Sequence, residues 1–216
     1  MEFLDEKIIK LMNEMQEKNN PISEQKEVSQ DEYEQAEIDI HQSFISINGE
    51  EIQIIEQTLF EGKVKIRMPK LFQLMLPELA SLKYPSERRP AIIYTDDSTT
   101  INLAFNHTQN LLNDTGITEF QESMVEILQQ TQPSAEWLEQ GDRVINDKNI
   151  GFIEVITPAL DGDIFNLMFF VSLDGKALIG TFNCMEEDMD DWRPVAKAMM
   201  ETLQVYPKEI DGGASR

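Results

Sequence analysis

The sequence is short of cysteine and histidine. Its 216 residues include one cysteine, Cys184, and two histidines, His41 and His107. A single cysteine excludes an intramolecular disulfide, which fits a reducing compartment such as the cytosol. Zinc sites need Cys and His ligands at short spacings, and these three residues lie far apart in the chain. The sequence therefore predicts no zinc centre.

Long apolar runs and glycine-rich motifs are also missing. No stretch approaches the ~20 apolar residues of a membrane-spanning helix. Glu2, Asp5 and Glu6 are acidic where a signal peptide would be basic. No G-x-S-x-G, G-x-G-x-x-G or G-x-x-x-x-G-K-[ST] motif is present to supply a nucleophile or bind a nucleotide. We expect a cytoplasmic protein that is not an enzyme and has no cofactor.

Basic side chains are scarce, because 40 Asp and Glu residues stand against 18 Lys and Arg residues and give a net charge of −22. A surface this acidic repels nucleic-acid phosphates and, for the same reason, anionic membranes. A basic protein, a peptide or cations would be attracted instead. We therefore expect a protein partner, with no nucleic acid and no membrane as partner.

Hydrophobic periodicity divides the chain into three parts. Residues 1–36 are predicted to be an amphipathic helix, over residues 1–17, and an acidic linker. The apolar stripe of the helix consists of Leu4, Ile8, Leu11, Met12 and Met15. We expect this helix to dock either on the body of the protein or on a partner. An α+β domain is predicted over residues 37–206 and a disordered tail over residues 207–216.

From about residue 37, apolar and polar residues alternate as in β-strands. The clearest hairpin is Ser43–Glu56, where Asn48-Gly49 tolerates the positive φ angles of a tight turn. Asp161-Gly162 and Asp174-Gly175 predict two further hairpins, between GFIEVITPAL, DIFNLMFFVSL and KALIGTFNC. Because hairpins join antiparallel strands, we predict an antiparallel sheet.

Two segments have the helical period. TEFQESMVEILQQ begins with Thr118 and Gln121 at the spacing of a capping box. In DDWRPVAKAMMETLQV, Trp192 begins an apolar face and Pro194 is predicted to lie in the first turn. Strands, helix, strands and helix follow in this order, so we predict an α+β fold with an antiparallel β-sheet flanked by helices.

The segment Phe182–Trp192, FNCMEEDMDDW, gathers five acidic side chains before the second helix. Acidic side chains are stabilising at a helix N-terminus, and Asp190 or Asp191 is predicted to be the N-cap, which contributes about 1 kcal/mol. A calcium loop would show D-x-D-x-D-G spacing and a later Glu, and the segment has no glycine. Capping accounts for the cluster, and weak, nonspecific cation binding is the alternative.

One group of basic residues stands out from the acidic background. Lys63, Lys65 and Arg67 line the polar face of the strand KVKIRMP, and other basic residues follow it. The candidate partner-binding patch consists of Lys63, Lys65, Arg67, Lys70, Arg88 and Arg89. Either these side chains form a solvated strand face paired with neighbouring acids, or they contact an acidic partner.

The pattern of residues 60–206 resembles the PsbP-like superfamily, which includes the PsbP subunit of photosystem II, the Ran-binding import factor Mog and bacterial DcrB-type relatives. The resemblance lies in the strand ending in Met68-Pro69, the hairpin IIYTDDSTTINLAF and the closing strand before a helix that begins with acids and Trp192. It implies a PsbP-like α/β/α sandwich and a non-enzymatic binding role. The predicted N-terminal helical extension and the hairpin Ser43–Glu56 depart from the compact family pattern. The resemblance assigns no interaction residues.

The resulting prediction is a non-catalytic, cytosolic protein-binding module, such as an adaptor or chaperone for another bacterial protein. One alternative is a structural protein that forms homo-oligomers through its N-terminal helix or the edge of its hairpin. The other is an enzyme whose residues come together only in three dimensions.

Overall fold

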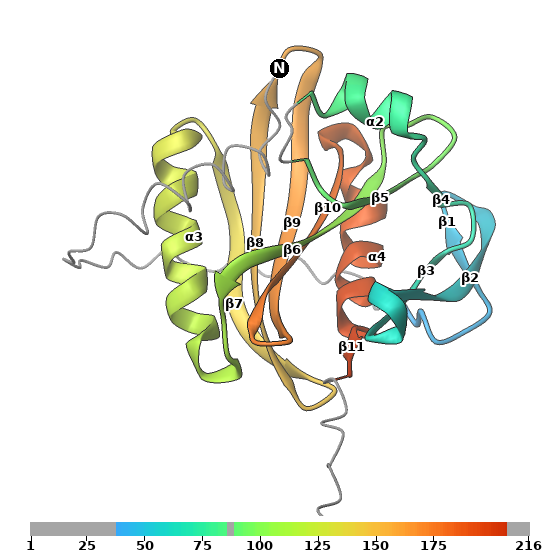
Figure 1. Cartoon of the computed structure of the whole chain (residues 1–216). Coiled ribbons are helices and arrows are strands. Elements are labelled where there is room, and N and C mark those ends of the chain that lie inside the picture. Colours follow the sequence, from blue (N-terminus) through green and yellow to red (C-terminus); the bar gives the residue numbers. More distant parts are fainter. Residues whose placement is uncertain (1–37, 86–88, 207–216) are drawn as a thin grey trace, which may run out of the picture.

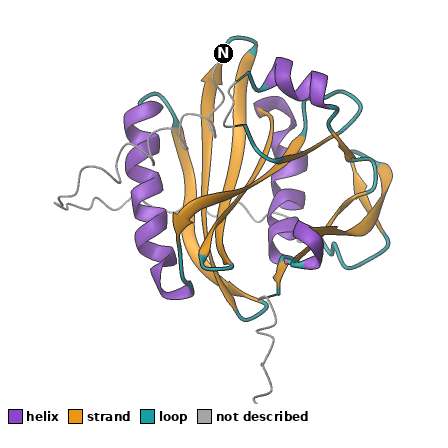
Figure 2. Cartoon of the chain, in the orientation of Figure 1, coloured by secondary structure: helices purple, strands orange, loops and turns teal. Residues whose placement is uncertain are grey.

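The computed structural model describes residues 38–85 and 89–206. The predicted N-terminal helix and linker, the predicted tail, and Arg88 of the predicted basic patch lie outside these residues. The described part folds into two antiparallel sheets and three α-helices (Figures 1 and 2). This is the α+β class that the order of elements predicts.

The smaller sheet has four strands in the order β1-β2-β3-β11. They are β1 (Phe44–Ile47), β2 (Glu50–Leu59), β3 (Val64–Pro69) and β11 (Gln204–Val205), with the 3₁₀ turn η1 (Phe60–Gly62) between β2 and β3. The predicted β1–β2 turn is confirmed, because Asn48 and Gly49 have φ angles of 54° and 79°. In β3, Val64, Ile66 and Met68 are buried as the alternation predicts.

The larger sheet has seven strands in the order β4-β5-β6-β10-β9-β8-β7. They are β4 (Gln73–Leu74), β5 (Ile92–Thr95), β6 (Asn102–Leu111), β7 (Glu136–Ile145), β8 (Lys148–Ala159), β9 (Gly162–Leu173) and β10 (Lys176–Met185). β9 lies between β10 and β8 and is buried along almost its whole length. Its nearly continuous apolar sequence reflects a strand that is covered on both faces.

Helices cover both faces of the larger sheet, and the smaller sheet forms an additional layer (Figure 1). α3 (Ile117–Thr131), with the 3₁₀ turn η2 (Asp114–Gly116) before it, packs on β8 and β9. α4 (Met189–Glu201) follows the 3₁₀ turn η3 (Glu186–Asp188) and lies on the opposite face, between the larger sheet and β3. α2 (Pro77–Lys83) packs with Ile93 of β5 and Ala104 of β6.

The main hydrophobic core surrounds α4, because this helix is covered from two sides. Its apolar residues form one cluster with inward residues of both sheets. Trp192 stacks on Phe72 and Phe182, with ring centroids 5.7 Å and 6.2 Å apart. The sequence predicts one sheet flanked by helices, whereas the structure adds a second sheet that covers the outer side of α4.

Two local predictions are wrong in detail, and one strand was missed. The N-cap of α3 is Gly116 and makes no side-chain capping bond. Gln121 is buried instead, and its amide Nε2 donates a hydrogen bond to the Phe152 carbonyl. Pro194 lies inside α4 rather than in its first turn, because the helix already begins at Met189. β7 is a strand of ten residues that the alternation pattern did not reveal.

Candidate interaction surface

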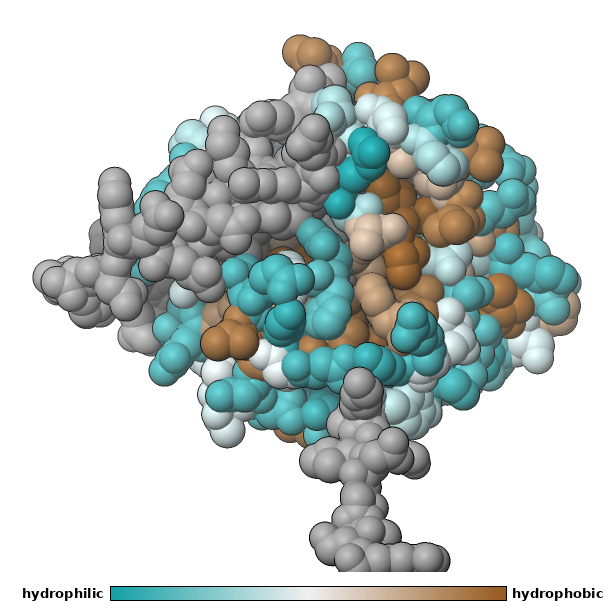
Figure 3. Space-filling view, in the orientation of Figure 1, coloured by the Kyte–Doolittle hydropathy of each residue, from teal (hydrophilic) through white to brown (hydrophobic). Residues whose placement is uncertain are grey.

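Four leucines are exposed on neighbouring segments at one edge of the larger sheet. Leu71 is 36% exposed, Leu74 61%, Leu76 68% and Leu82 80%. We call these four residues the leucine surface. Apolar side chains gather in Figure 3 over the part of the molecule that carries α2, β4 and β5. Clustered exposed apolar side chains mark interaction sites more often than isolated ones do.

Local geometry explains why these leucines point outward. Pro77 occupies the first position of α2, where its missing N–H is not needed. Ala80 is buried and Leu79 packs against the same apolar cluster. Leu82 lies two residues beyond Ala80, and two helical residues turn by about 200°, so Leu82 faces away from the body. Leu74 lies in β4, the edge strand of the sheet, which pairs on one side only, with β5.

The leucine surface lies in the part of the chain where basic residues outnumber acidic ones. Residues 70–89 contain four basic and two acidic side chains, in a protein of net charge −22. Lys70 Nζ donates to Gln53 Oε1 at 3.0 Å and Arg89 Nη1 to the Tyr84 carbonyl at 3.3 Å. Lys83 Nζ donates to the Thr99 carbonyl, and burial lowers the pKa of Lys83. A partner at this surface would meet apolar side chains on a segment in which basic residues outnumber acidic ones.

The first basic residues of the predicted patch are Lys63, directly before β3, and Lys65 and Arg67 within it, and each contacts an acceptor of this chain. Lys63 forms an ion pair with Asp174 at 2.6 Å, and Lys65 forms one with Glu56 at 2.9 Å. Arg67 is structural, because it donates to three consecutive backbone carbonyls in residues 40–42, at 2.8–3.2 Å. Arg89 lies near α2, away from this group in the sequence. Whether any of these residues contacts an acidic partner stays a prediction.

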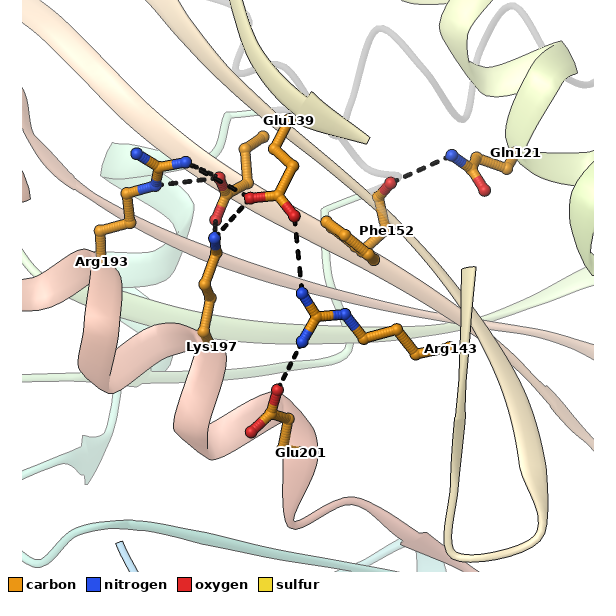
Figure 4. A network of polar contacts seen from close by, with 8 residues as sticks. Gln121, Glu139, Arg143, Phe152, Arg193, Lys197 and Glu201 are labelled. Carbon is orange, nitrogen blue, oxygen red and sulfur yellow. Dashed lines mark hydrogen bonds and ion pairs between the residues drawn. The ribbon is translucent and has the colours of Figure 1, made fainter. Parts of the chain in front are cut away.

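The most buried charge in the described residues is Glu154 of β8, whose side chain is 0% exposed. Arg193 of α4 donates to Glu154 Oε2 twice, at 2.9 Å from Nε and 2.6 Å from Nη2. Lys197 Nζ lies 3.7 Å from Oε1 of the same carboxylate. Figure 4 shows this network from close by. It fixes the orientation of α4 on the larger sheet, since two N–H groups of one guanidinium converge on a single carboxylate oxygen.

Glu139 of β7 extends the network toward solvent. It accepts a hydrogen bond from Lys197 at 2.5 Å and lies 3.5 Å from Arg143, which in turn contacts Glu201 of α4 at 2.6 Å. Burial raises the pKa of Glu154 and outweighs the opposing effects of Arg193 and Lys197. For Glu139, burial acts in the same direction, but the hydrogen bond and charge of Lys197, with Arg143 and Arg193, lower its pKa overall.

The acidic cluster lies where α4 begins, but it does not cap the helix as predicted. The N-cap is Asp188, one helical residue lies before Asp190, and no side chain makes a capping bond. Asp190 and Asp191 are in the first turn, so the favourable interaction with the helix dipole remains. Burial raises the pKa of Asp188, and Glu187, Asp191 and Asp96 add to the effect.

The two histidines and the cysteine do not form a site. His107 Nε2 lies 3.0 Å from the Leu173 carbonyl, and its ring meets Phe60 edge-on. Cys184 is buried, and burial, with the charge of Asp188, raises its pKa to about 12. A thiol with this pKa stays protonated and is a poor nucleophile. Within residues 38–85 and 89–206, no group of three His, Cys, Asp or Glu side chains could hold a metal ion.

Sequence reasoning missed the leucine surface because its members look like core residues. Leu74 and Leu76 fall in the apolar run LFQLML, and Leu82 lies in the helical period of α2. Pro77 was the available signal, because proline often begins a helix and so separates the leucines before it from those inside it.

No helix among the residues that the structure describes is long and apolar enough to cross a bilayer.

Comparisons with known proteins give a result at the level of fold. No family model matches the sequence, and no curated protein matches it. The structure is similar to that of cyanobacterial PsbP (CyanoP) from Synechocystis sp. PCC 6803, with a TM-score of 0.53 and 13% identity. The alignment covers 71% of this chain and 92% of CyanoP.

Two further similar structures are less close in shape. One is a protein of unknown function, PA94, from Pseudomonas aeruginosa, a putative regulator, with a TM-score of 0.44, 14% identity and coverage of 72% of this chain and 99% of that one. The other is LpqN, involved in cell envelope biogenesis of Mycobacterium tuberculosis, with a TM-score of 0.44, 9% identity and coverage of 71% and 92%. The antiparallel sheets, the helices and the match to CyanoP together show that this chain has a PsbP-like fold.

Proposed function

We propose that the protein is a non-catalytic, cytosolic protein-binding module that uses the leucine surface to contact its partner. The supporting observation is the exposure of Leu74, Leu76 and Leu82, at 61%, 68% and 80%, on adjoining segments. Burying a leucine side chain contributes about 1.5–3 kcal/mol, so three leucines could supply much of the affinity of a specific complex. The single, buried cysteine is compatible with the cytosol.

A role as an adaptor or chaperone for another bacterial protein would fit this surface chemistry. Exposed leucines beside a positive local charge suit an amphipathic, acidic segment of a partner. The helix predicted from the sequence of residues 1–17, which lie outside the described residues, would add a second apolar element to such a module. A catalytic role is less well supported, because Glu154 is fully buried and held by Arg193, and so cannot reach a substrate.

The test is affinity capture from the native host with tagged full-length protein. We expect a partner that is recovered by the wild type and lost with Leu74→Asp/Leu82→Asp. The matched control is Leu111→Asp/Leu160→Asp, because these leucines are 82% and 84% exposed at other positions. If the wild type and both variants recover the partner equally, the leucine surface does not contact the partner.

Two alternatives are separated by related variants. Charge reversal with Lys65→Glu/Lys70→Glu tests the basic patch. If this variant loses the partner and Leu74→Asp/Leu82→Asp retains it, the partner contacts the basic patch and not the leucine surface. Self-association is tested by light scattering of the full-length protein across a concentration series. A dimer that dissociates on Leu74→Asp/Leu82→Asp would make a second copy the partner.

A further inference from the structure

We propose that the leucine surface is covered, within the same molecule, by this chain's own N-terminal segment, residues 1–17. The inference rests on the proposed function of the leucine surface and names its regulation. An intramolecular occupant would compete with the partner for the same leucines. Three observations point to this segment: its apolar stripe, its charge, and the place where its tether joins the body.

The predicted stripe of the segment matches the leucine surface in chemistry and size. Its five apolar side chains lie between Leu4 and Met15, a helical length of about 16 Å. The seven-residue helix α2 is about 10 Å long, and the extended residues from Leu71 to Leu76 lengthen the apolar surface further. Two apolar surfaces of similar length can bury one another.

The opposite net charges of the two segments favour contact between residues 1–17 and the leucine surface. Residues 1–17 contain five acidic and two basic side chains, whereas residues 70–89 contain four basic and two acidic ones. Most of the remaining body shares the negative charge of the whole protein and repels an acidic segment. The leucine surface therefore combines exposed apolar side chains with a segment in which basic residues outnumber acidic ones.

The tether joins the body close to the leucine surface. The described chain begins at Ile38, and Arg67 of β3 holds the carbonyls of Ile40, His41 and Gln42. Lys70 follows Arg67 after about 10 Å of extended chain, and the leucine surface begins at Leu71. A coil of the twenty residues 18–37 would span about 25 Å. A tether of this length keeps the segment at a local concentration on the order of millimolar.

Covering the surface would lower the apparent affinity for a partner. If the leucine surface is accessible for about one tenth of the time, the apparent dissociation constant rises about tenfold. The segment would then act as an internal competitor that a partner must displace. Weakening its apolar stripe should increase partner capture.

Cross-linking of the full-length protein tests this proposal directly. We expect the variant Ile8→Cys/Leu82→Cys to form an intramolecular disulfide under mild oxidation at low protein concentration. The matched control is Ile8→Cys/Leu111→Cys, because Leu111 is 82% exposed and lies about 23 Å along β6 from Ala104, which packs with α2. Cys184 is 1% exposed and should not interfere.

A labelling experiment provides an independent measurement. We expect maleimide to modify Leu82→Cys about tenfold faster when the chain also carries Ile8→Asp/Leu11→Asp. The labelling rate of Leu111→Cys should not change. Equal cross-linking at both sites, or an unchanged rate at Leu82→Cys, would overturn the proposal. Cross-links between two chains would also overturn it, because the occupant would then be a second copy.

The outcomes separate this inference from the proposed function. If cross-linking fails but capture of the host partner still depends on Leu74 and Leu82, only the intramolecular contact is wrong. If the cross-link forms but capture does not depend on these leucines, the proposed function is wrong and the segment covers the surface for another reason.

Discussion

α4 and α2 both pack on the larger sheet, but they are covered to very different degrees. α4 lies between two sheets, and six of its thirteen residues are buried. α2 has seven residues, of which only Ala80 is buried, and it presents Leu82 to solvent. The difference indicates that α4 contributes mainly to stability, whereas α2 has an exposed side that is available for binding. Substitutions in α4 should therefore unfold the protein, whereas substitutions on the outer side of α2 should not.

The largest expected difference is between Trp192 and Leu82. Trp192→Ala removes a ring that stacks on Phe72 and Phe182 in the main core, and should reduce the free energy of unfolding by about 3–5 kcal/mol. Leu82→Ala, on an exposed position, should change it by less than about 0.5 kcal/mol. Urea denaturation measures both values. A similar loss for both variants would contradict the contrast between the helices.

The ionic contact beneath α4 should have the next largest effect. Glu154→Ala removes the oxygen that accepts two hydrogen bonds from Arg193, a side chain that is 16% exposed, and breaking a buried ion pair costs about 3 kcal/mol or more. Glu51→Ala is the matched control, because this acid is exposed on β2. If denaturation curves of the two variants coincide, the network does not stabilise the position of α4.

In β3, which covers the side of α4 away from the larger sheet, substitutions of Arg67 and Lys65 should have different effects on stability, although the two residues are neighbours on one face of the strand. Arg67→Glu removes charged hydrogen bonds to three carbonyls and should cost about 2 kcal/mol or more. Lys65→Glu breaks an ion pair with Glu56 that lies at the surface, and should have a much smaller effect, because solvent screens such pairs. Thermal denaturation of both variants measures the difference, and the reverse order would show that the carbonyl contacts are not stabilising.

A smaller effect concerns the pH dependence of the contact between α4 and β7. The pKa of Glu139 is lowered from 4.5 in the folded protein, so its stabilising contribution is present above that value and is lost as the pH falls through the lowered pKa. Because Glu139 is 36% exposed, the contribution should be below about 1 kcal/mol. Glu139→Gln should therefore reduce the loss of stability in acid, as measured by urea denaturation at several pH values.

Glu154 provides a check on this pH dependence, because its pKa is shifted in the opposite direction from that of Glu139. Burial raises its folded pKa above the ordinary value of 4.5, so its contribution is largest below that value and is lost as the pH rises through the raised pKa. The free energy of unfolding of Glu154→Gln, relative to that of the wild type, should therefore increase as the pH rises. For Glu139→Gln it should increase as the pH falls. The same trend in both variants would contradict the two assignments.

The smallest effect on stability is expected for the leucine surface itself. Leu74→Asp/Leu82→Asp replaces two exposed leucines, and each substitution should change the free energy of unfolding by less than about 0.5 kcal/mol. The same variant should nevertheless lose the partner. A cooperative unfolding curve that shifts strongly would show that these leucines belong to the core of the protein.

Much of the sheet could be predicted from short-range patterns. The Asn48-Gly49, Asp161-Gly162 and Asp174-Gly175 dipeptides each mark a real hairpin, and the glycine of each pair has the positive φ angle that such a turn needs. β7 could not be found in this way, since EWLEQGDRVI lacks a clean alternation and becomes a strand by pairing with β8. Pairing between distant segments is a property of the folded chain.

The candidate site was harder to predict than the fold. The sequence drew attention to Lys63, Lys65 and Arg67 because basic residues are rare in it, yet Arg67 is bound to three backbone carbonyls. Leu74 and Leu82 attracted no attention, because leucines in apolar runs normally belong to the core. Exposure depends on which other segments lie over a side chain, and composition does not contain that information.

The sequence by itself determined the α+β class, the β1–β2, β8–β9 and β9–β10 hairpins and the two longer helices, because local backbone preferences and apolar periodicity act over a few residues. Only the tertiary structure decided that α4 is buried between two sheets, that Glu154 and Arg193 meet, and that the leucines around α2 remain uncovered by the described body. These features depend on contacts between residues far apart in the chain, where packing and desolvation are settled by the whole fold.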